Sequence, residues 1–290
     1  NKKSFFRSKG IYILAALCRE KLGEYERSQG KIPQIIFLEN HRIFISADTT
    51  EEIDVIAKEV FDAIKKKVAI FPCKEKVDFD EALAGTLAPE IRMLYSAEGK
   101  AVVKHTAYHD IIAFARDSEA FSPLADSFSP DHIVYCKAHP LYVENKGDET
   151  PAELEKAFRS YTEKNGFKPK IIFVQGVGMF ACGGTKKEAE TASIVFEDAI
   201  KIATYAMSFG GAKHMSGELT AFISNWEVES YRAKVALSGA TEKRLAGKIS
   251  IVTGSAQGFG AGIAEAMIRE GAYVAIADMN VEGAENMAKS

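Results

Sequence analysis

The sequence has few cysteines, no long apolar run and no excess of charge of one sign. Its four cysteines, Cys18, Cys73, Cys136 and Cys182, are scattered without a C-x-x-C spacing, which favours reduced thiols over a disulfide framework or a zinc knuckle. No uncharged apolar run approaches the roughly 18 residues of a membrane helix, and the first residues, NKKSFFRSKG, lack the apolar stretch of a signal peptide. Lys and Arg number 37 against 40 Asp and Glu, which argues against a polybasic nucleic-acid binder. We therefore expect a soluble, cytoplasmic protein that acts on a small molecule, without nucleic-acid or membrane partners.

The length and composition are those of an ordinary globular protein. With 290 residues, 47% apolar and 27% charged, the chain has room for about two domains of roughly 100–200 residues each. It starts at Asn1 rather than at a methionine, and its last residues, VEGAENMAKS, read as a helix without a stop signal. These two ends predict a fragment of a longer protein.

An internal repeat occupies much of the chain. Residues 22–65 align without a gap on residues 158–201, and thirteen of the 44 positions are identical. Each copy reads as a helix that ends near a glycine, an apolar strand, a short turn, a second strand and a helix that starts at a Thr-x-x-Glu capping box. The strands are expected at Ile35–Leu38 and Ile43–Ser46 in the first copy and at Ile171–Val174 and Met179–Cys182 in the second, with the first strand of each copy buried.

The second copy is preceded by secondary structure that the first copy lacks. The segment SPDHIVYCKAHPLYV predicts strands at Ile133–Cys136 and Leu141–Val143. If the copies are duplicated domains, the first has lost its front. We therefore expect two units of one design, at residues 1–75 and 76–240, of which the first is incomplete.

His41 lies in the predicted turn of the first copy, where the second copy has Val177. A histidine in one of two duplicated units suggests a function kept in one and lost in the other, although a turn histidine satisfied by water is the simpler interpretation. A divalent metal needs three or four ligands, so His41 alone does not make a site.

Other histidines are weaker metal candidates. His105 and His109 have the i, i+4 spacing of two ligands on one helix face, but no glutamate follows His105 and no third ligand is evident. His132 and His139 flank the strand expected between them. Asp131 could orient the imidazole of His132, although such a pair is more often structural.

The segment LENHRIFISADTTEEI resembles the closing segment of the class II aldolase/adducin fold. In that family an Asn-His-Gly turn supplies the last of three zinc histidines, and the zinc polarises the carbonyl of a ketose phosphate during retro-aldol cleavage. The resemblance implies His41 as a zinc ligand. The chain departs from the family in having no H-x-H segment for the other two ligands and in placing Arg42 where the glycine favours positive φ or a close backbone approach.

From Leu245 the sequence predicts a strand, a glycine-rich turn, a helix and a second strand. The strands are expected at Ile249–Val252 and Tyr273–Ala277 and the helix at Ala261–Arg269. Gly254, Gly258 and Gly260 form G-x-x-x-G-x-G in the turn, where glycines let a pyrophosphate approach the amides at a helix N-terminus. Asp278, after the second strand, is placed to bind ribose hydroxyls and to repel a 2′-phosphate, which favours NAD over NADP.

The string TGSAQGFG, residues 253–260, resembles the cofactor motif T-G-x-x-x-G-x-G of the short-chain dehydrogenase/reductase family. The resemblance implies a cofactor site made of Gly254, Ser255, Gln257, Gly258, Phe259, Gly260, Asp278 and Met279. In that family the catalytic Ser and Tyr-x-x-x-Lys follow far behind the motif, beyond Ser290 in this numbering. We therefore expect no catalytic residue within this chain.

In their order along the chain, these pieces resemble the bifunctional class II aldolase/short-chain dehydrogenase proteins, some of which are described as rhamnulose-1-phosphate aldolase/lactaldehyde dehydrogenases. The implied fold class is α/β, with two aldolase/adducin-like three-layer α/β/α units followed by the start of a Rossmann-type doubly wound sheet at residues 245–290. The implied function is that of an NAD-dependent short-chain dehydrogenase for a small hydroxy-aldehyde or sugar-derived alcohol, fused to a class II aldolase-like region, homo-oligomeric and catalytically incomplete as a fragment. Two alternatives stay open: the aldolase-like region is a non-catalytic oligomerisation scaffold, or a zinc-dependent sugar-phosphate aldolase is the main activity.

Overall fold

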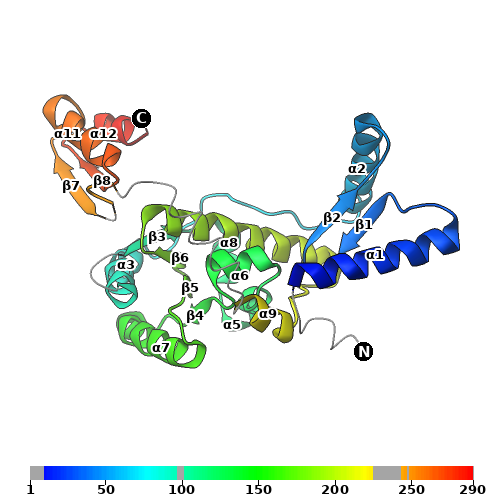
Figure 1. Cartoon of the computed structure of the whole chain (residues 1–290). Helices are drawn as coiled ribbons and strands as arrows, with labels where there is room; N and C mark the ends of the chain where they lie inside the picture. The colour runs from blue at the N-terminus through cyan, green and yellow to red at the C-terminus, as the bar shows by residue number, and fades with distance from the viewer. Residues whose placement is uncertain (1–9, 97–100, 225–242, 247, 290) are drawn as a thin grey trace.

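The computed structural model describes residues 10–96, 101–224, 243–246 and 248–289. An N-terminal arm of two helices and a hairpin, a central α/β unit and a small C-terminal segment follow one another along the chain (Figure 1). None of the helices in the described ranges is both long and apolar enough to span a bilayer.

The arm is a hairpin flanked by two helices. It consists of α1 (Gly10–Gln29), β1 (Ile35–Leu38), β2 (Arg42–Ile45) and α2 (Thr50–Lys65), and the two strands pair antiparallel. The capping box at the start of α2 is formed, because Thr49 Oγ1 accepts from the Glu52 amide at 3.3 Å and the Glu52 carboxylate accepts from the Asp48 amide at 3.3 Å. The predicted elements of the first copy are therefore present.

The predicted burial of Ile35–Leu38 is wrong. Residues of β1 alternate between exposed and half-buried, and the Phe37 side chain is 68% exposed. The reason is that β1 pairs only with β2 in the described ranges, so the hairpin lacks the neighbouring strands and second helix layer that bury its counterpart in the central unit. As described, the arm is thus part of a layered unit and not a complete α/β/α sandwich.

The central unit holds a four-stranded mixed sheet. Its helices are α3 (Glu81–Tyr95), α4 (His109–Phe114), α5 (Ser118–Phe121), α6 (Pro130–Cys136), α7 (Thr150–Asn165), α8 (Lys186–Ala206) and α9 (Gly217–Ser224), with 3-10 turns η2 (Ser122–Leu124), η3 (Gly147–Glu149) and η4 (Met207–Phe209). Its strands are β3 (Val102–Thr106), β4 (Leu141–Val143), β5 (Ile171–Val174) and β6 (Gly178–Gly183). The order is β3-β6-β5-β4, and only the β4–β5 pair is parallel.

Helices cover both faces of this sheet, which gives the predicted three layers. Along β5, Ile171 and Phe173 pack with residues of α4 and α8, whereas Ile172 and Val174 pack with residues of α3 and α7. All four side chains are fully buried. Burying a large apolar side chain stabilises a fold by about 1.5–3 kcal/mol, so β5 is the centre of the core.

The strand predicted at Ile133–Cys136 is instead the helix α6. Pro130 occupies the first turn of α6, where its fixed φ suits a helix and its missing amide proton costs nothing, and Ser129 before it is extended with φ −146°. The apolar letters Ile-Val-Tyr-Cys therefore bury one side of a short helix against α8 and α9. The strand predicted at Leu141–Val143 is present as β4.

A strap without helix or strand, residues 66–80, runs from the arm along the central unit (Figure 1). The amides of Ala69 and Ile70 donate to Ser208 Oγ at 3.0 and 3.2 Å. Further along, the Cys73 amide donates to the Asp110 carboxylate at 2.9 Å. The strap is therefore hydrogen bonded to the central unit at Ala69, Ile70 and Cys73.

The C-terminal segment is a β-α-β-α unit. It consists of β7 (Ile249–Thr253), α11 (Gly258–Arg269), β8 (Tyr273–Ala277) and α12 (Val281–Lys289), and the two strands pair parallel. β8 has the predicted range, and β7 extends one residue beyond its predicted end, to Thr253. The helix α11 starts at Gly258, earlier than the predicted Ala261. A cation–π contact joins the segment to the central unit, because Lys186 Nζ lies 4.6 Å from the ring centroid of Tyr273.

Candidate functional site

The turn of the arm hairpin carries His41 and contacts the central unit. Asn40 has a positive φ of 55°, and its side-chain amide donates to the backbone oxygens of Phe128 at 3.1 Å and Lys213 at 2.9 Å. Glu39 forms an ion pair with the Lys213 ammonium at 2.5 Å. The turn is therefore held on the central unit by side-chain contacts on either side of Asn40.

His41 is engaged by its neighbour rather than by a set of metal ligands. Arg42 donates from Nε to Nδ1 of His41 at 2.8 Å, so the neutral ring carries its proton on Nε2. Burial and the charge of Arg42 lower the pKa of His41, against the opposing charge of Asp131. In the part of the chain that the structure describes, no group of three His, Cys, Asp or Glu side chains is arranged to hold a metal ion. This donor set does not fit the three-histidine zinc site that the resemblance implies.

The two copies of the turn differ at the position after His41. In the central unit this position is Gly178, with φ 128°, and a Cβ there would lie 2.8 Å from the Thr106 oxygen and 2.9 Å from Nε2 of His105. Both atoms belong to β3, the strand next to β6. The arm has no described strand in that place, and Arg42 is not in a positive-φ conformation. Arg42 is therefore tolerated where β3 forces a glycine in the central unit.

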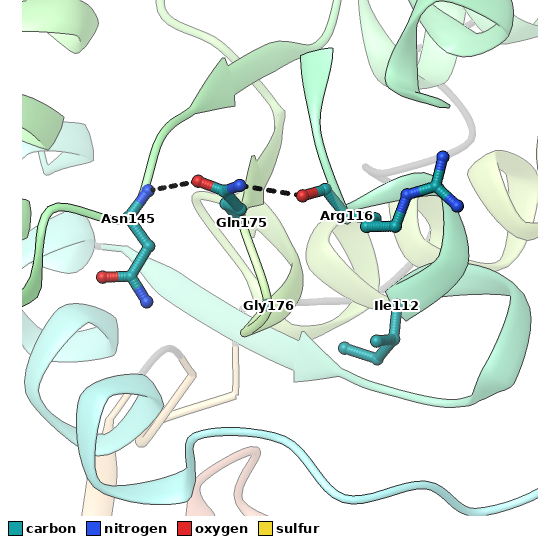
Figure 2. Close-up of a pocket in the computed structure, with 5 residues that line it drawn as sticks. All are labelled: Ile112, Arg116, Asn145, Gln175 and Gly176. Atoms are coloured by element: carbon teal, nitrogen blue, oxygen red, sulfur yellow. Dashed lines mark hydrogen bonds between the residues drawn. The ribbon is translucent and has the colours of Figure 1, made fainter. Parts of the chain in front are cut away.

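A cavity of about 430 Å³ lies beside the matching turn of the central unit, lined by Ile112, Arg116, Asn145, Gln175 and Gly176 (Figure 2). Gln175 links its walls, because its Oε1 accepts from the Asn145 amide at 3.1 Å and its Nε2 donates to the Arg116 oxygen at 2.8 Å. The Gln175 amide thus holds the turn in place. Sequence reasoning missed this cavity because its residues come from three separate segments.

The other histidines are dispersed. His105 lies in β3 and His109 is the first residue of α4, so the predicted shared helix face is wrong, because residues 102–106 pair with β6 as a strand. His132 lies in α6, and its Nδ1 is 3.1 Å from Ser129 Oγ rather than hydrogen bonded to Asp131.

Sequence reasoning also missed a histidine–carboxylate pair. Nδ1 of His139 lies 2.8 Å from Oδ1 of Asp126, thirteen residues earlier in the chain. No sequence spacing predicts this pair, because α6 lies between the two residues and reverses the chain so that His139 comes back beside Asp126.

The glycine-rich turn between β7 and α11 has the geometry that the sequence requires. Gly254 and Gly258 have positive φ values of 66° and 61°, which side chains rarely adopt. A Cβ on either would meet nothing within 4 Å, so both open to the outside. A Cβ on Gly260 would lie 2.0 Å from the Gly254 oxygen, so the third glycine is needed for close packing of α11 on the turn.

Ser255 ties the ends of β7 and β8 together. Its side chain is fully buried, and Oγ donates to the Val252 oxygen at 2.6 Å while accepting from the Ala277 amide at 3.1 Å. This bridge brings the glycine turn next to the residues that follow β8.

Asp278 is fixed at the carboxyl end of β8. Its two carboxylate oxygens accept from the amides of Asn280 and Ala256, each at 2.9 Å, and these bonds lower the pKa of the carboxyl group. The side chains of Phe259 and Met279 are almost fully exposed.

The residues named from the short-chain dehydrogenase motif therefore lie together. Gln257 precedes the first turn of α11 without a side-chain cap, which leaves the helix amides open to an anion. This arrangement fits the adenosine half of a dinucleotide, with the pyrophosphate at the open glycine faces and the ribose at Asp278.

Comparisons with known proteins show similarity to one aldolase family and to named oxidoreductases. Residues 82–232, just over half of the chain, match the family model described as aldolase class II, second domain. The uncharacterized oxidoreductase YuxG of Bacillus subtilis (strain 168) is 25% identical over 231 residues, which cover 72% of this chain and 33% of YuxG.

Two shorter matches have higher identity. The sorbitol dehydrogenase of Cereibacter sphaeroides is 61% identical over 41 residues, which cover 14% of this chain and 16% of that enzyme. The D-threitol dehydrogenase of Mycolicibacterium smegmatis (strain ATCC 700084 / mc(2)155) is 53% identical over 45 residues, covering 16% and 17%. The chain thus spans about a third of the length of YuxG and about a sixth of each dehydrogenase.

Proposed function

The chain belongs to the family of class II aldolase second domains, and from this premise we propose that it joins an aldolase-like region to an NAD-dependent short-chain dehydrogenase. In this proposal residues 1–75 are part of one aldolase-like unit, residues 76–240 are a second, degenerate unit, and residues 245–290 begin the dehydrogenase. The oxidoreductase name of YuxG supports the combination.

The geometry around Asp278 carries the proposal. A strand, a turn with two open glycines, a helix with uncapped amides and a second parallel strand ending in a fixed carboxylate form the half-site that dinucleotides use. The two dehydrogenase matches have lengths of 41 and 45 residues, about the length of residues 245–290. The names of these enzymes, sorbitol dehydrogenase and D-threitol dehydrogenase, support a polyol or another sugar-derived alcohol as the substrate class.

NAD, when bound, would supply the hydride acceptor. The residues of this chain would hold it: the amides around Gly258 would bind the pyrophosphate, and the Asp278 carboxylate would accept hydrogen bonds from the ribose hydroxyls. The same carboxylate would repel the 2′-phosphate of NADP. The exposed Phe259 and Met279 would flank the entry of the cofactor.

Cofactor titration tests this proposal. We expect the full-length protein to bind NADH at least about tenfold more tightly than NADPH. The fluorescence of the reduced nicotinamide measures the binding of each cofactor. Asp278→Asn should remove this preference, whereas Glu282→Gln, a carboxylate in the first turn of the neighbouring α12, should preserve it. Equal affinities in the unmodified protein, or an unchanged preference in Asp278→Asn, would overturn the assignment.

A second candidate function, a non-catalytic scaffold, is favoured by the arm turn. Asn40 and Glu39 hold the turn on the central unit, and His41 is engaged by Arg42 rather than by further metal ligands. A scaffold role predicts that the full-length protein assembles as an oligomer, contains no stoichiometric zinc and lacks retro-aldol activity on sugar phosphates. Bound zinc together with that cleavage activity would favour the zinc-dependent aldolase instead.

A further inference from the structure

The pair of His139 and Asp126 belongs neither to the hairpin turn that carries His41 nor to the glycine-rich turn. Nδ1 of His139 is 2.8 Å from Oδ1 of Asp126, and the two side chains are 41% and 52% exposed. With its Nδ1 proton directed at the carboxylate, a neutral imidazole presents the lone pair of Nε2 outward. Within the described residues, neither Nε2 of His139 nor the second oxygen of Asp126 has a hydrogen-bond partner.

A similar pair elsewhere in the unit shows what a structural role looks like. Nδ1 of His109 lies 3.0 Å from Oδ1 of Asp110. The other oxygen of Asp110 accepts from the Cys73 amide at 2.9 Å and from Thr204 Oγ1 at 3.4 Å, so this carboxylate anchors the strap. Asp126 makes no comparable contacts among the described residues, which leaves its pairing with His139 without a structural purpose of that kind.

The backbone before His139 is strained and pinned. Lys137 has φ 67° and ψ 164°, a region that is essentially reserved for glycine. Ser127 Oγ donates to the Ala138 oxygen at 2.8 Å, and the Tyr161 hydroxyl donates to the His139 oxygen. Strained conformations persist where the surroundings fix them, and they concentrate at ligand sites.

The pair opens into a cavity of about 230 Å³. The cavity is lined by Asp126, Ala138, His139, Asn165, Phe167, Met215, Gly217, Thr220, Ala221 and Ser224. Among the described residues no lysine or arginine lines it, so a phosphate or another anion would face the Asp126 carboxylate without a lining counter-charge. The Lys137 ammonium lies over the ring of Phe167, 5.2 Å from its centroid. Hydroxyl, amide and imidazole groups beside one aromatic ring suit a neutral molecule that carries several hydroxyls on a short carbon chain.

Two of these polar groups are oriented by the protein itself. Nδ2 of Asn165 donates to the Tyr161 oxygen at 2.9 Å, which fixes its amide and leaves Oδ1 as an acceptor. Ser224 Oγ donates to the Thr220 oxygen at 2.8 Å, so its lone pairs are available to a ligand hydroxyl. The cavity thus offers acceptors at His139, Asn165 and Ser224.

We propose that this cavity binds a small neutral polyol, with Nε2 of His139 accepting a hydrogen bond from one hydroxyl and Asp126 fixing the imidazole. The site is separate from the dinucleotide half-site, and binding there does not depend on hydride transfer.

Calorimetric titration of the full-length protein with erythritol, a four-carbon polyol, tests the proposal. We expect a dissociation constant on the order of millimolar, as suits a ligand of so few atoms, and weaker binding of glycerol 3-phosphate. His139→Gln should weaken erythritol binding at least about tenfold, and Asp126→Asn should weaken it to a smaller extent. His109→Gln is the matched control, because it removes the other histidine of an Asp pair and should leave binding unchanged.

Several outcomes would overturn the proposal. These are no erythritol binding by the unmodified protein, tighter binding of glycerol 3-phosphate than of erythritol, or equal affinities of His139→Gln and His109→Gln. Circular dichroism spectra of both variants check that they are folded. In the unmodified protein, the chemical shifts of the His139 ring carbons should move on addition of erythritol, which tests the site without any variant. Asp278→Asn should keep erythritol binding, which separates failure of this proposal from failure of the cofactor assignment.

Discussion

Arg42 donates a hydrogen bond to Nδ1 of His41 at 2.8 Å, whereas the same two positions of the central unit hold Val177 and Gly178. The difference follows from what lies beside each turn. In the central unit β3 approaches so closely that only glycine fits at 178, while the described part of the arm has no such strand. The duplicated turn therefore has room for a guanidinium–imidazole contact in only one copy.

Removing the guanidinium should change the titration of His41. Arg42 lowers the pKa of His41, after burial as the larger cause, so Arg42→Ala should raise it. Titration of the histidine ring protons by NMR measures the change. Arg116→Ala, at a distant exposed arginine, should leave the His41 pKa where it was, and an unchanged value in Arg42→Ala would contradict the observed contact.

The two copies should differ sharply in their response to the same substitution. Phe173 is fully buried, so Phe173→Ala should lower the free energy of unfolding by about 3–5 kcal/mol. Phe37, at the matching place in β1, is 68% exposed. Phe37→Ala should therefore change the free energy of unfolding by about 0.5 kcal/mol or less. Urea unfolding measures both, and similar losses would show that the β1 face is buried in solution.

Two neighbouring glycines of the C-terminal segment provide another matched pair. Gly260→Ala would place a Cβ 2.0 Å from the Gly254 oxygen and should distort the turn and abolish NADH binding. Gly262, inside α11, has nothing within 4 Å of its added Cβ, so Gly262→Ala should preserve binding and stabilise the helix by about 1 kcal/mol. Retained NADH affinity in Gly260→Ala would place the cofactor elsewhere.

Acid should destabilise the protein through buried histidines. Burial lowers the pKa of His105 and His132 below the ordinary value of 6.5, so below that pH the unfolded chain binds more protons than the folded chain. The free energy of unfolding should therefore fall as the pH drops from about 6.5 towards the pKa values that the two histidines have in the folded chain. Urea midpoints at several pH values measure the slope. His105→Gln should make it shallower, and an unchanged slope in this variant would contradict the burial effect.

How far the sequence predicts the structure depends on whether the cause is local. The strands β7 and β8 agree with the predicted ranges to within one residue, because apolar runs and glycines define them locally. The letters Ile-Ile-Phe occur in both β1 and β5, yet they are buried only in β5. Burial is set by neighbouring strands and helices, which the letters of one strand do not encode.

The misassigned helix and the missed pair have the same kind of explanation. A short apolar run such as that in α6 fits a strand or a helix equally well, and Pro130 decides for the helix. The contact between Asp126 and His139 depends on how α6 turns the chain back, which no periodicity reports. The glycine motif, by contrast, was predictable because each glycine is needed for a local reason, either a positive φ or a close backbone contact.

The β1–β2 hairpin has a consequence for how the chain behaves at high concentration. Within the described ranges its two outer edges have no neighbouring strand, and Phe37 and Phe44 are exposed on it. Free edges with apolar side chains are templates for adding a strand from another molecule. Solutions of this chain should therefore self-associate through the arm as concentration rises, and a charged residue in place of Phe37 should keep them dispersed.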